Sequence, residues 1–169
     1  MKIIVKGLVY FTFFMLLTNL WISKALATEI KIPAMKTMPG QLVHIPIIID
    51  EVDNLAGVKL VMNYDSKILH FKDGAKTKQT NSLMHIINSK KPGTLIVVMA
   101  GARGIKIKEL PILILTFEVG EGLEKDQTTR LSITEAQLMS DKLKDIKYTI
   151  TIDPISISRD AVPASPKNE

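Results

Sequence analysis

The sequence predicts an all-β domain built as a sandwich or jelly roll. Nearly every apolar run either alternates with polar residues or is solidly aliphatic, and Gly, Pro, Asn or Asp bounds each run. The runs recur at short spacing without a long helical segment between them, which is typical of sandwiches. Cysteine is absent, so the domain must depend on its apolar core rather than on disulfides.

Residues 1–27 precede this domain and have the pattern of a secretory signal peptide. Lys2 and Lys6 form a basic start, residues 7–22 carry no charge, and Ala-Leu-Ala at 25–27 provides a small-residue cleavage site. We expect cleavage after Ala27, which predicts a secreted, periplasmic or cell-surface protein. If the segment were retained it would be a membrane anchor, although its apolar run is slightly short of the ~20 residues that span a bilayer.

The charge balance changes when this segment is removed. The whole chain has 22 Lys and Arg against 17 Asp and Glu, and removal of Lys2, Lys6 and Lys24 leaves 19 basic residues, a net charge of +2. This small excess gives no ground for nucleic-acid binding. Residues 160–169 combine proline with polar residues and have no apolar period, so we expect a disordered tail after a domain at 28–159.

Nine strands are expected in the domain. They fall at 29–32, 41–49, 57–64, 67–71, 94–99, 110–119, 129–133, 147–152 and 155–158. Met-Pro-Gly at 38–40 and Lys-Pro-Gly at 91–93 are turn signals just ahead of strands. Residues 80–88 fit either one helical turn or a short strand. Pro46 cannot donate to a β-ladder, so its strand is expected to be an edge strand or to be bulged there.

The strand at 57–64 has one apolar face. Its inward side chains are those of Val58, Leu60, Met62 and Tyr64. Its outward side chains are those of Lys59, Val61 and Asn63. Asp65 follows, and its short side chain can accept hydrogen bonds from nearby backbone N–H groups. We therefore interpret Asp65 as a corner residue that turns the chain, so that Leu69 and Phe71 return to the core.

Four segments, in order, resemble the cohesin domain family. GVKLVMNYDSKILHF at 57–71 resembles the family's strand that ends in Tyr-Asp-Pro, although Ser66 stands in place of the proline. MPGQLVHIPIII at 38–49 and ELPILILTFEVGEG at 109–122 resemble two further family strands. The region 131–158 resembles the closing Asp-rich loop and final strands. The resemblance spans about 30–158, nearly the whole predicted domain.

This resemblance implies both a fold and a function. Cohesins are nine-stranded jelly-roll sandwiches that bind dockerins, the small helical calcium-binding modules of polysaccharide-degrading enzymes, on one flat sheet face. It implies that Lys59, Val61 and Asn63 lie on the partner-binding face, with residues 99–103, including Arg103, nearby. The expected function is non-catalytic protein binding in an extracellular or cell-surface assembly. A general protein-binding role outside cellulose-degrading assemblies is an equal alternative.

Other functions have weaker support in the sequence. Carbohydrate-binding modules share this sandwich, but sugar platforms need exposed aromatic rings, and the mature chain has no Trp and few candidates, among them Tyr148. An enzyme is not expected, since the chain has no G-x-S-x-G and its three histidines lack zinc-ligand spacing. Gly-Ala-Arg-Gly at 101–104 is interpreted as a turn. No cofactor is expected. Asp50 and Asp53 are weak candidates for calcium, and the loop at 141–145 also gathers carboxylates, but neither loop has the spacing of an EF-hand.

Overall fold

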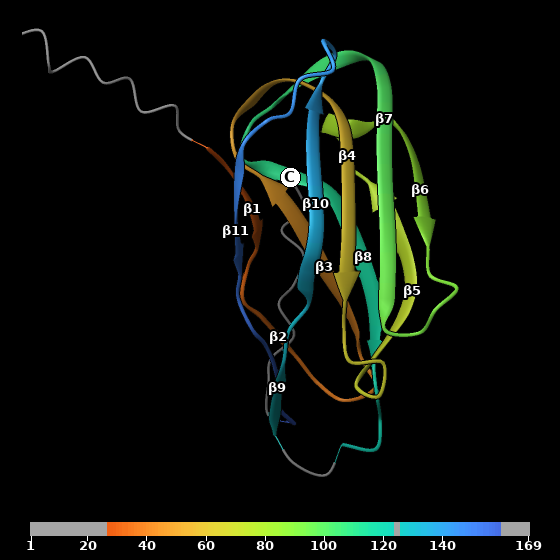
Figure 1. The fold of residues 1–169 in the computed structure, drawn as a ribbon. Coiled ribbons are helices and arrows are strands. Elements are labelled where there is room, and N and C mark those ends of the chain that lie inside the picture. The colour runs from red at the N-terminus through yellow and green to blue at the C-terminus, as the bar shows by residue number, and fades with distance from the viewer. Residues whose placement is uncertain (1–26, 124–125, 160–169) are drawn as a thin grey trace, which may run out of the picture.

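The computed structural model describes residues 27–123 and 126–159, and in these ranges two large β-sheets face each other (Figure 1). The five-stranded sheet has the order β11 (Tyr148–Ile152), β1 (Thr28–Ile32), β3 (Leu42–Ile49), β8 (Leu110–Val119) and β5 (Leu69–Lys76). The four-stranded sheet has the order β10 (Ser132–Ser140), β4 (Val52–Asn63), β7 (Thr94–Ile107) and β6 (Met84–Asn88). The sandwich predicted from the sequence is therefore confirmed.

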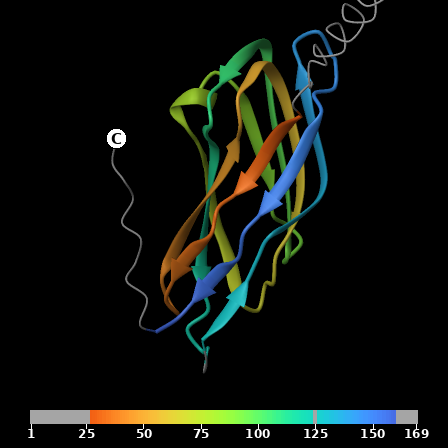
Figure 2. The ribbon, with the colours of Figure 1, turned by 90° about the vertical axis from the view of Figure 1, so that its left-hand side faces the viewer.

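A third, small sheet continues one edge of the sandwich. It has the order β2 (Met35–Thr37), β12 (Ile155–Ile157) and β9 (Gln127–Thr129). The parallel pairs β1–β11 and β2–β12 keep one register across both sheets, as the two ribbons side by side in Figure 2 show. Pro33 and Pro154 interrupt the two ribbons at the same level, because proline lacks the N–H that a ladder needs.

The core fills the space between the two large sheets. Alternate residues of the strands point inward, and aliphatic side chains dominate among them, as expected for sheets with one buried face. Fully buried members include Ile45, Ile47, Leu60, Val97, Leu115 and Phe117. Val58 and Met62 are inward on β4 as predicted. Tyr64, just after this strand, is half-buried and packs edge-on against Phe117 with ring centroids 5.0 Å apart.

The predicted turns are confirmed by their backbone geometry. Gly40 and Gly93 have positive φ angles of 75° and 81°, which the turns after Pro39 and Pro92 require. At the corner after β4, the carboxylate of Asp65 accepts a hydrogen bond from the Lys67 N–H at 2.9 Å. Asp65 is therefore the corner residue that the sequence predicts.

Several predicted strand limits are wrong. Residues 129–133 do not form one strand, because Thr129 ends β9 and Ser132 begins β10. The segment 101–104 is not a simple turn but part of β7, which extends to Ile107. In the ambiguous stretch 80–88, the 3-10 turn η2 (Lys78–Thr80) precedes the short strand β6.

Pro46 lies in a strand with a neighbour on each side, but its own position is locally an edge. β3 pairs with β8 along its length, whereas β1 pairs only with Ile48 and Ile49. A bulge also separates Ile47 from Ile48. Pro46 is thus accommodated where β1 does not pair with β3, and close to a bulge of the kind that the sequence suggested.

Residues 1–26 of the predicted signal peptide and the predicted tail at 160–169 lie outside the described residues.

Candidate partner-binding face

The outward side of the four-stranded sheet is the strongest candidate site. In Figure 1 this sheet lies in front, and no other described element covers it. We call this surface the four-stranded face and define it by the outward residues that are opposite one another in the strand register. Listed from β10 to β6, its rows are Met139–Gly57–Ala100–Met84, Gln137–Lys59–Val98–Ile86 and Glu135–Val61–Ile96–Asn88, closed by Ser132–Asn63–Thr94.

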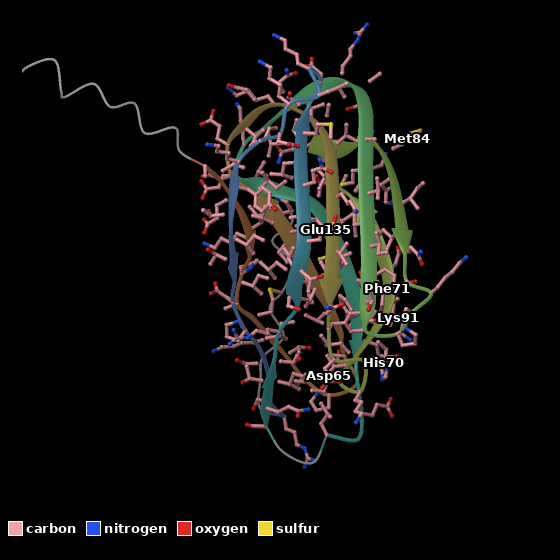
Figure 3. All side chains as sticks on the ribbon, viewed as in Figure 1. Asp65, His70, Phe71, Met84, Lys91 and Glu135 are labelled. Carbon is pink, nitrogen blue, oxygen red and sulfur yellow. The ribbon has the colours of Figure 1, made fainter. Side chains whose placement is uncertain are left out.

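The two lateral halves of this face differ in chemistry. The half on β6 and β7 is apolar, and three of its side chains are well exposed: Met84 at 74%, Ile86 at 66% and Val98 at 40%. Met84 is seen at the border of the molecule in Figure 3. Because these residues are neighbours in register, they form a contiguous patch rather than scattered exposed positions.

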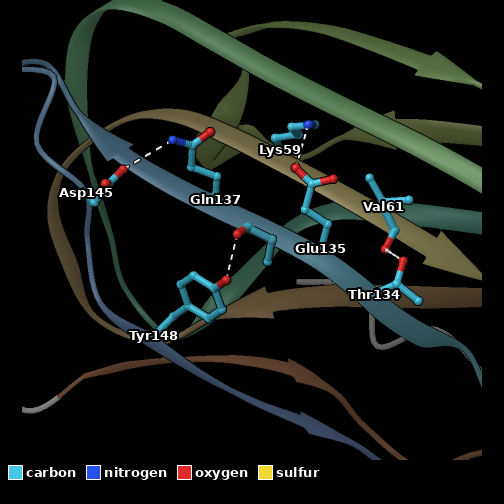
Figure 4. A network of polar contacts seen from close by, with 8 residues as sticks. Lys59, Val61, Thr134, Glu135, Gln137, Asp145 and Tyr148 are labelled. Carbon is cyan, nitrogen blue, oxygen red and sulfur yellow. Dashed lines mark hydrogen bonds and ion pairs between the residues drawn. The ribbon is translucent and has the colours of Figure 1, made fainter.

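The half on β4 and β10 is polar and internally paired. Lys59 donates to the carboxylate of Glu135 at 2.6 Å, and Gln137 donates to Asp145 at 3.2 Å (Figure 4). Both members of the Lys59–Glu135 pair are largely exposed, so the pair adds little stability. It does neutralise Glu135, the one carboxylate among the residues that define the face.

A depression of about 510 Å³ lies at the end of the face where β4 meets the β10–β11 loop. Gly57, Ala100 and Gly101 leave it open because their side chains are small, while Met139 and Leu143 line it with apolar groups. Leu143 is 81% exposed at the tip of the loop. Such a hollow suits an apolar side chain from a partner.

β7 bulges beside this depression. Gly57 is opposite Ala100, but Leu55 is opposite Ile105, so four residues of β7 lie across from one of β4. A Cβ on Gly104 would be only 2.8 Å from the carbonyl carbon of Asn54. The bulge therefore depends on glycine, and exposed Arg103 lies within it.

The predicted site residues Lys59, Val61 and Asn63 all lie on the four-stranded face, and Arg103 lies at its end. Met99, which was expected near this face, points into the core and is 1% exposed. The sequence did not single out the apolar residues of β6 and β7. The only available signal was the pair of large apolar residues Met84 and Ile86 two positions apart.

The aromatic rings offer no exposed platform in the described ranges. Tyr64 and Phe71 both pack edge-on against buried Phe117, with centroids 5.0 and 5.6 Å apart. The Tyr148 hydroxyl donates to the Ala136 carbonyl at 2.6 Å, which joins β11 to β10 across the open side of the sandwich (Figure 4). All four rings are therefore engaged within the fold.

Metal-ligating groups do not gather in the part of the chain that the structure describes, where no cluster of three or more His, Asp or Glu is present. Asp53, one of the calcium candidates, pairs with Lys106 at 3.1 Å, and Glu51 also pairs with Lys106. Both carboxylates raise the pKa of Lys106, and Asp53 has the larger effect. The Asp50 carboxylate accepts the Glu51 N–H at 2.7 Å. Calcium at Asp50 and Asp53 stays a prediction.

The histidines are apart from one another. His44 contacts the Thr116 hydroxyl at 3.0 Å on the five-stranded sheet, and His85 contacts the Gly74 carbonyl at 3.2 Å between β6 and β5. His70 is exposed on β5. His44 is the one histidine that contacts a hydroxyl, and no carboxylate among the described residues contacts its ring to complete a triad.

An open, partly apolar sheet face on a β-sandwich is typical of a protein-binding module. The Cohesin domain model matches residues 28–157, and the chain belongs to the cohesin domain family, whose members are non-catalytic binding modules. No curated protein matches this chain. No helix in the described residues is long and apolar enough to cross a membrane.

Solved cohesins share the fold at low sequence identity. The sixth cohesin of scaffoldin B from Acetivibrio cellulolyticus, in complex with the Cel5 dockerin, is 16% identical with a TM-score of 0.72, covering 79% of this chain and 100% of that one. The OlpA cohesin of Clostridium thermocellum, in complex with Doc918, is 15% identical with a TM-score of 0.68, covering 79% and 100%. A non-cellulosomal cohesin from the archaeon Archaeoglobus fulgidus is 15% identical with a TM-score of 0.69, covering 79% and 92%.

Proposed function

We propose that this chain is an exported, non-catalytic module that binds a dockerin-type protein partner on the four-stranded face. The observation that carries the proposal is the register-aligned patch of Met84, Ile86 and Val98, which are 74%, 66% and 40% exposed. Such a patch on an otherwise well-packed sandwich is typical of a protein interface. Similar cohesins are bound to dockerins in their solved complexes, which supports this class of partner.

The setting we propose is an extracellular or cell-surface assembly linked to polysaccharide degradation. The basic start, uncharged middle and Ala-Leu-Ala of residues 1–27 support export. We propose attachment of another protein rather than direct binding of polysaccharide, because Tyr64, Phe71, Phe117 and Tyr148 are engaged within the fold. The separation of the three histidines supports a role without catalysis.

Isothermal titration calorimetry with the Cel5 dockerin and Doc918 tests the proposal directly. We expect the full chain to bind at least one dockerin in a panel that contains these two and further dockerins. Ile86→Asp should raise Kd at least about tenfold, because it places a carboxylate where about 1–2 kcal/mol of apolar burial is available. The matched control is Leu42→Asp, since Leu42 is 55% exposed on the other large sheet.

Two results would count against the proposal. The first is the absence of binding to every dockerin of a broad panel. The second is an equal loss of affinity in the Ile86 and Leu42 variants, which would place the contact elsewhere or indicate unfolding. Circular dichroism and melting curves of both variants separate these two causes.

A further inference from the structure

One long segment of this chain carries basic residues but no acidic ones. Residues 74–108 contain no Asp or Glu and seven Lys or Arg: Lys76, Lys78, Lys90, Lys91, Arg103, Lys106 and Lys108. The remaining residues from 28 onward hold 12 basic and 17 acidic residues. The overall charge near neutrality therefore hides a strong separation of charge along the chain.

This segment builds the apolar half of the four-stranded face. It contains all of β6 and β7, which run antiparallel and are joined by the turn at 89–93. Lys90 and Lys91 are exposed in that turn, at one end of the half, where Figure 3 labels Lys91. Arg103 is exposed at the other end, where β7 bulges beside the depression.

The cations at these two ends are not neutralised within the described residues. Lys106 is paired with Glu51 and Asp53, and the Lys76 ammonium donates to the carbonyls of Asn81 and Leu83. By contrast, Lys90, Lys91 and Arg103 have no carboxylate within ion-pair distance in the ranges that the structure describes.

The rest of the face has no net charge to oppose them. Lys59 neutralises Glu135, and the loop at 141–145 holds two aspartates and two lysines. An approaching partner therefore meets an apolar patch with unpaired positive charge at both ends. Electrostatic complementarity at an interface favours carboxylates opposite such cations and penalises further cations.

We infer that the partner's docking helix is acidic at both ends of its apolar contact, with carboxylates that meet Lys90 and Lys91 at one end and Arg103 at the other. The inference rests on the proposed function and specifies the partner's chemistry. Thr94 and Ala100, in the outermost rows of the face, are six residues apart, or about 20 Å along the strand. A helix covers that length in about 14 residues, and the cations lie beyond both rows, so the acidic groups are at least about four turns apart.

Two synthetic helical peptides test this charge requirement independently of any dockerin. Both carry the same apolar face over about four turns, and one has Glu at both ends whereas the other has Lys. We expect the full chain to bind the Glu peptide at least about tenfold more tightly at low salt, and the preference to shrink at high salt. Equal affinity, preference for the Lys peptide, or binding of neither would overturn the inference.

Charge-reversal variants locate the effect on the face. Lys90→Glu with Lys91→Glu, and separately Arg103→Glu, should each weaken the Glu peptide about five- to tenfold and strengthen the Lys peptide. The matched control for Arg103→Glu is Lys36→Glu, which makes the same charge change at an exposed position of β2 in the small sheet. For the double variant the control is Lys36→Glu with Lys31→Glu, since Lys31 is exposed on β1. If the controls changed the peptide affinities equally, the effect would depend on the net charge of the chain rather than on the face, and the inference would be overturned.

The same variants distinguish failure of this inference from failure of the proposed function. If no dockerin binds, the proposed function fails, and the peptides still decide the charge preference. If a dockerin binds and Ile86→Asp weakens it, but the reversals at Lys90, Lys91 and Arg103 do not, the face is the docking site and the charge inference alone is wrong.

Discussion

Replacement of Phe117 by alanine tests the packing on which the fold depends. Phe117 is fully buried on β8, and the rings of Tyr64 and Phe71 contact it edge-on at 5.0 and 5.6 Å. Truncation of a buried Phe to Ala costs about 3–5 kcal/mol. The two ring contacts contribute about 0.5–1.5 kcal/mol each to such a cost. We therefore expect a value of about 4 kcal/mol, in the middle of the first range.

Urea denaturation followed by circular dichroism measures this cost. Phe117→Leu retains much of the volume but loses both ring contacts, so we expect it to cost about 2 kcal/mol. Thr116→Ala is the control on the same strand, since Thr116 is half-buried and its hydroxyl contacts His44, and it should cost less than about 1 kcal/mol. A loss below about 1.5 kcal/mol for Phe117→Ala would refute the reasoning, because even simple transfer of the side chain costs more.

Three further changes test local features of the fold. Lys72 holds the pKa of Glu118 below its usual value by a hydrogen bond and by its charge, so the stability from this pair is present above the usual carboxyl pKa and is lost as pH falls through the lowered one. Lys72→Met should therefore raise the Glu118 pKa in an NMR titration. Tyr148→Phe removes the hydrogen bond between the two sheets and should cost about 1 kcal/mol, with faster amide exchange in β11. Gly104→Ala should cost about 1–3 kcal/mol in a melting experiment, because its Cβ would meet Asn54, and unchanged stability would contradict that geometry.

Local chemistry explains which parts of the fold could be predicted. The alternation at 57–64 and the Asp65 corner depend on neighbours in sequence, and both are present in the structure. The stretch 129–133 was misread because its residues all suit a strand. In the structure the buried side chain of Leu131 lies between the end of β9 and the start of β10. Which sheet a strand joins depends on distant partners, and periodicity does not reveal it.

The candidate site was only half predictable for a related reason. Lys59 and Val61 were found because β4 has a clear polar and apolar face. β6 lacks that contrast, because Met84 and Ile86 point outward while Ile87 is partly buried. The patch exists only through the pairing of β6 with β7 and of β7 with β4, which joins segments far apart in the sequence.

The two outer faces of the sandwich differ in how their exposed apolar residues are grouped, and this difference supports the proposed docking side. The five-stranded sheet also exposes leucines, Leu42 at 55% and Leu110 at 53%, but Leu42 is opposite Glu118, and Leu110 lies at the opposite end of β8. These positions are isolated, so each can be surrounded by water at little cost. On the other sheet, Ile86 is opposite Val98, and Met84 lies one row away. Adjacent apolar side chains are the arrangement that a partner can bury together, so the grouping of exposed residues, rather than their number, favours the four-stranded face as the interface that we propose.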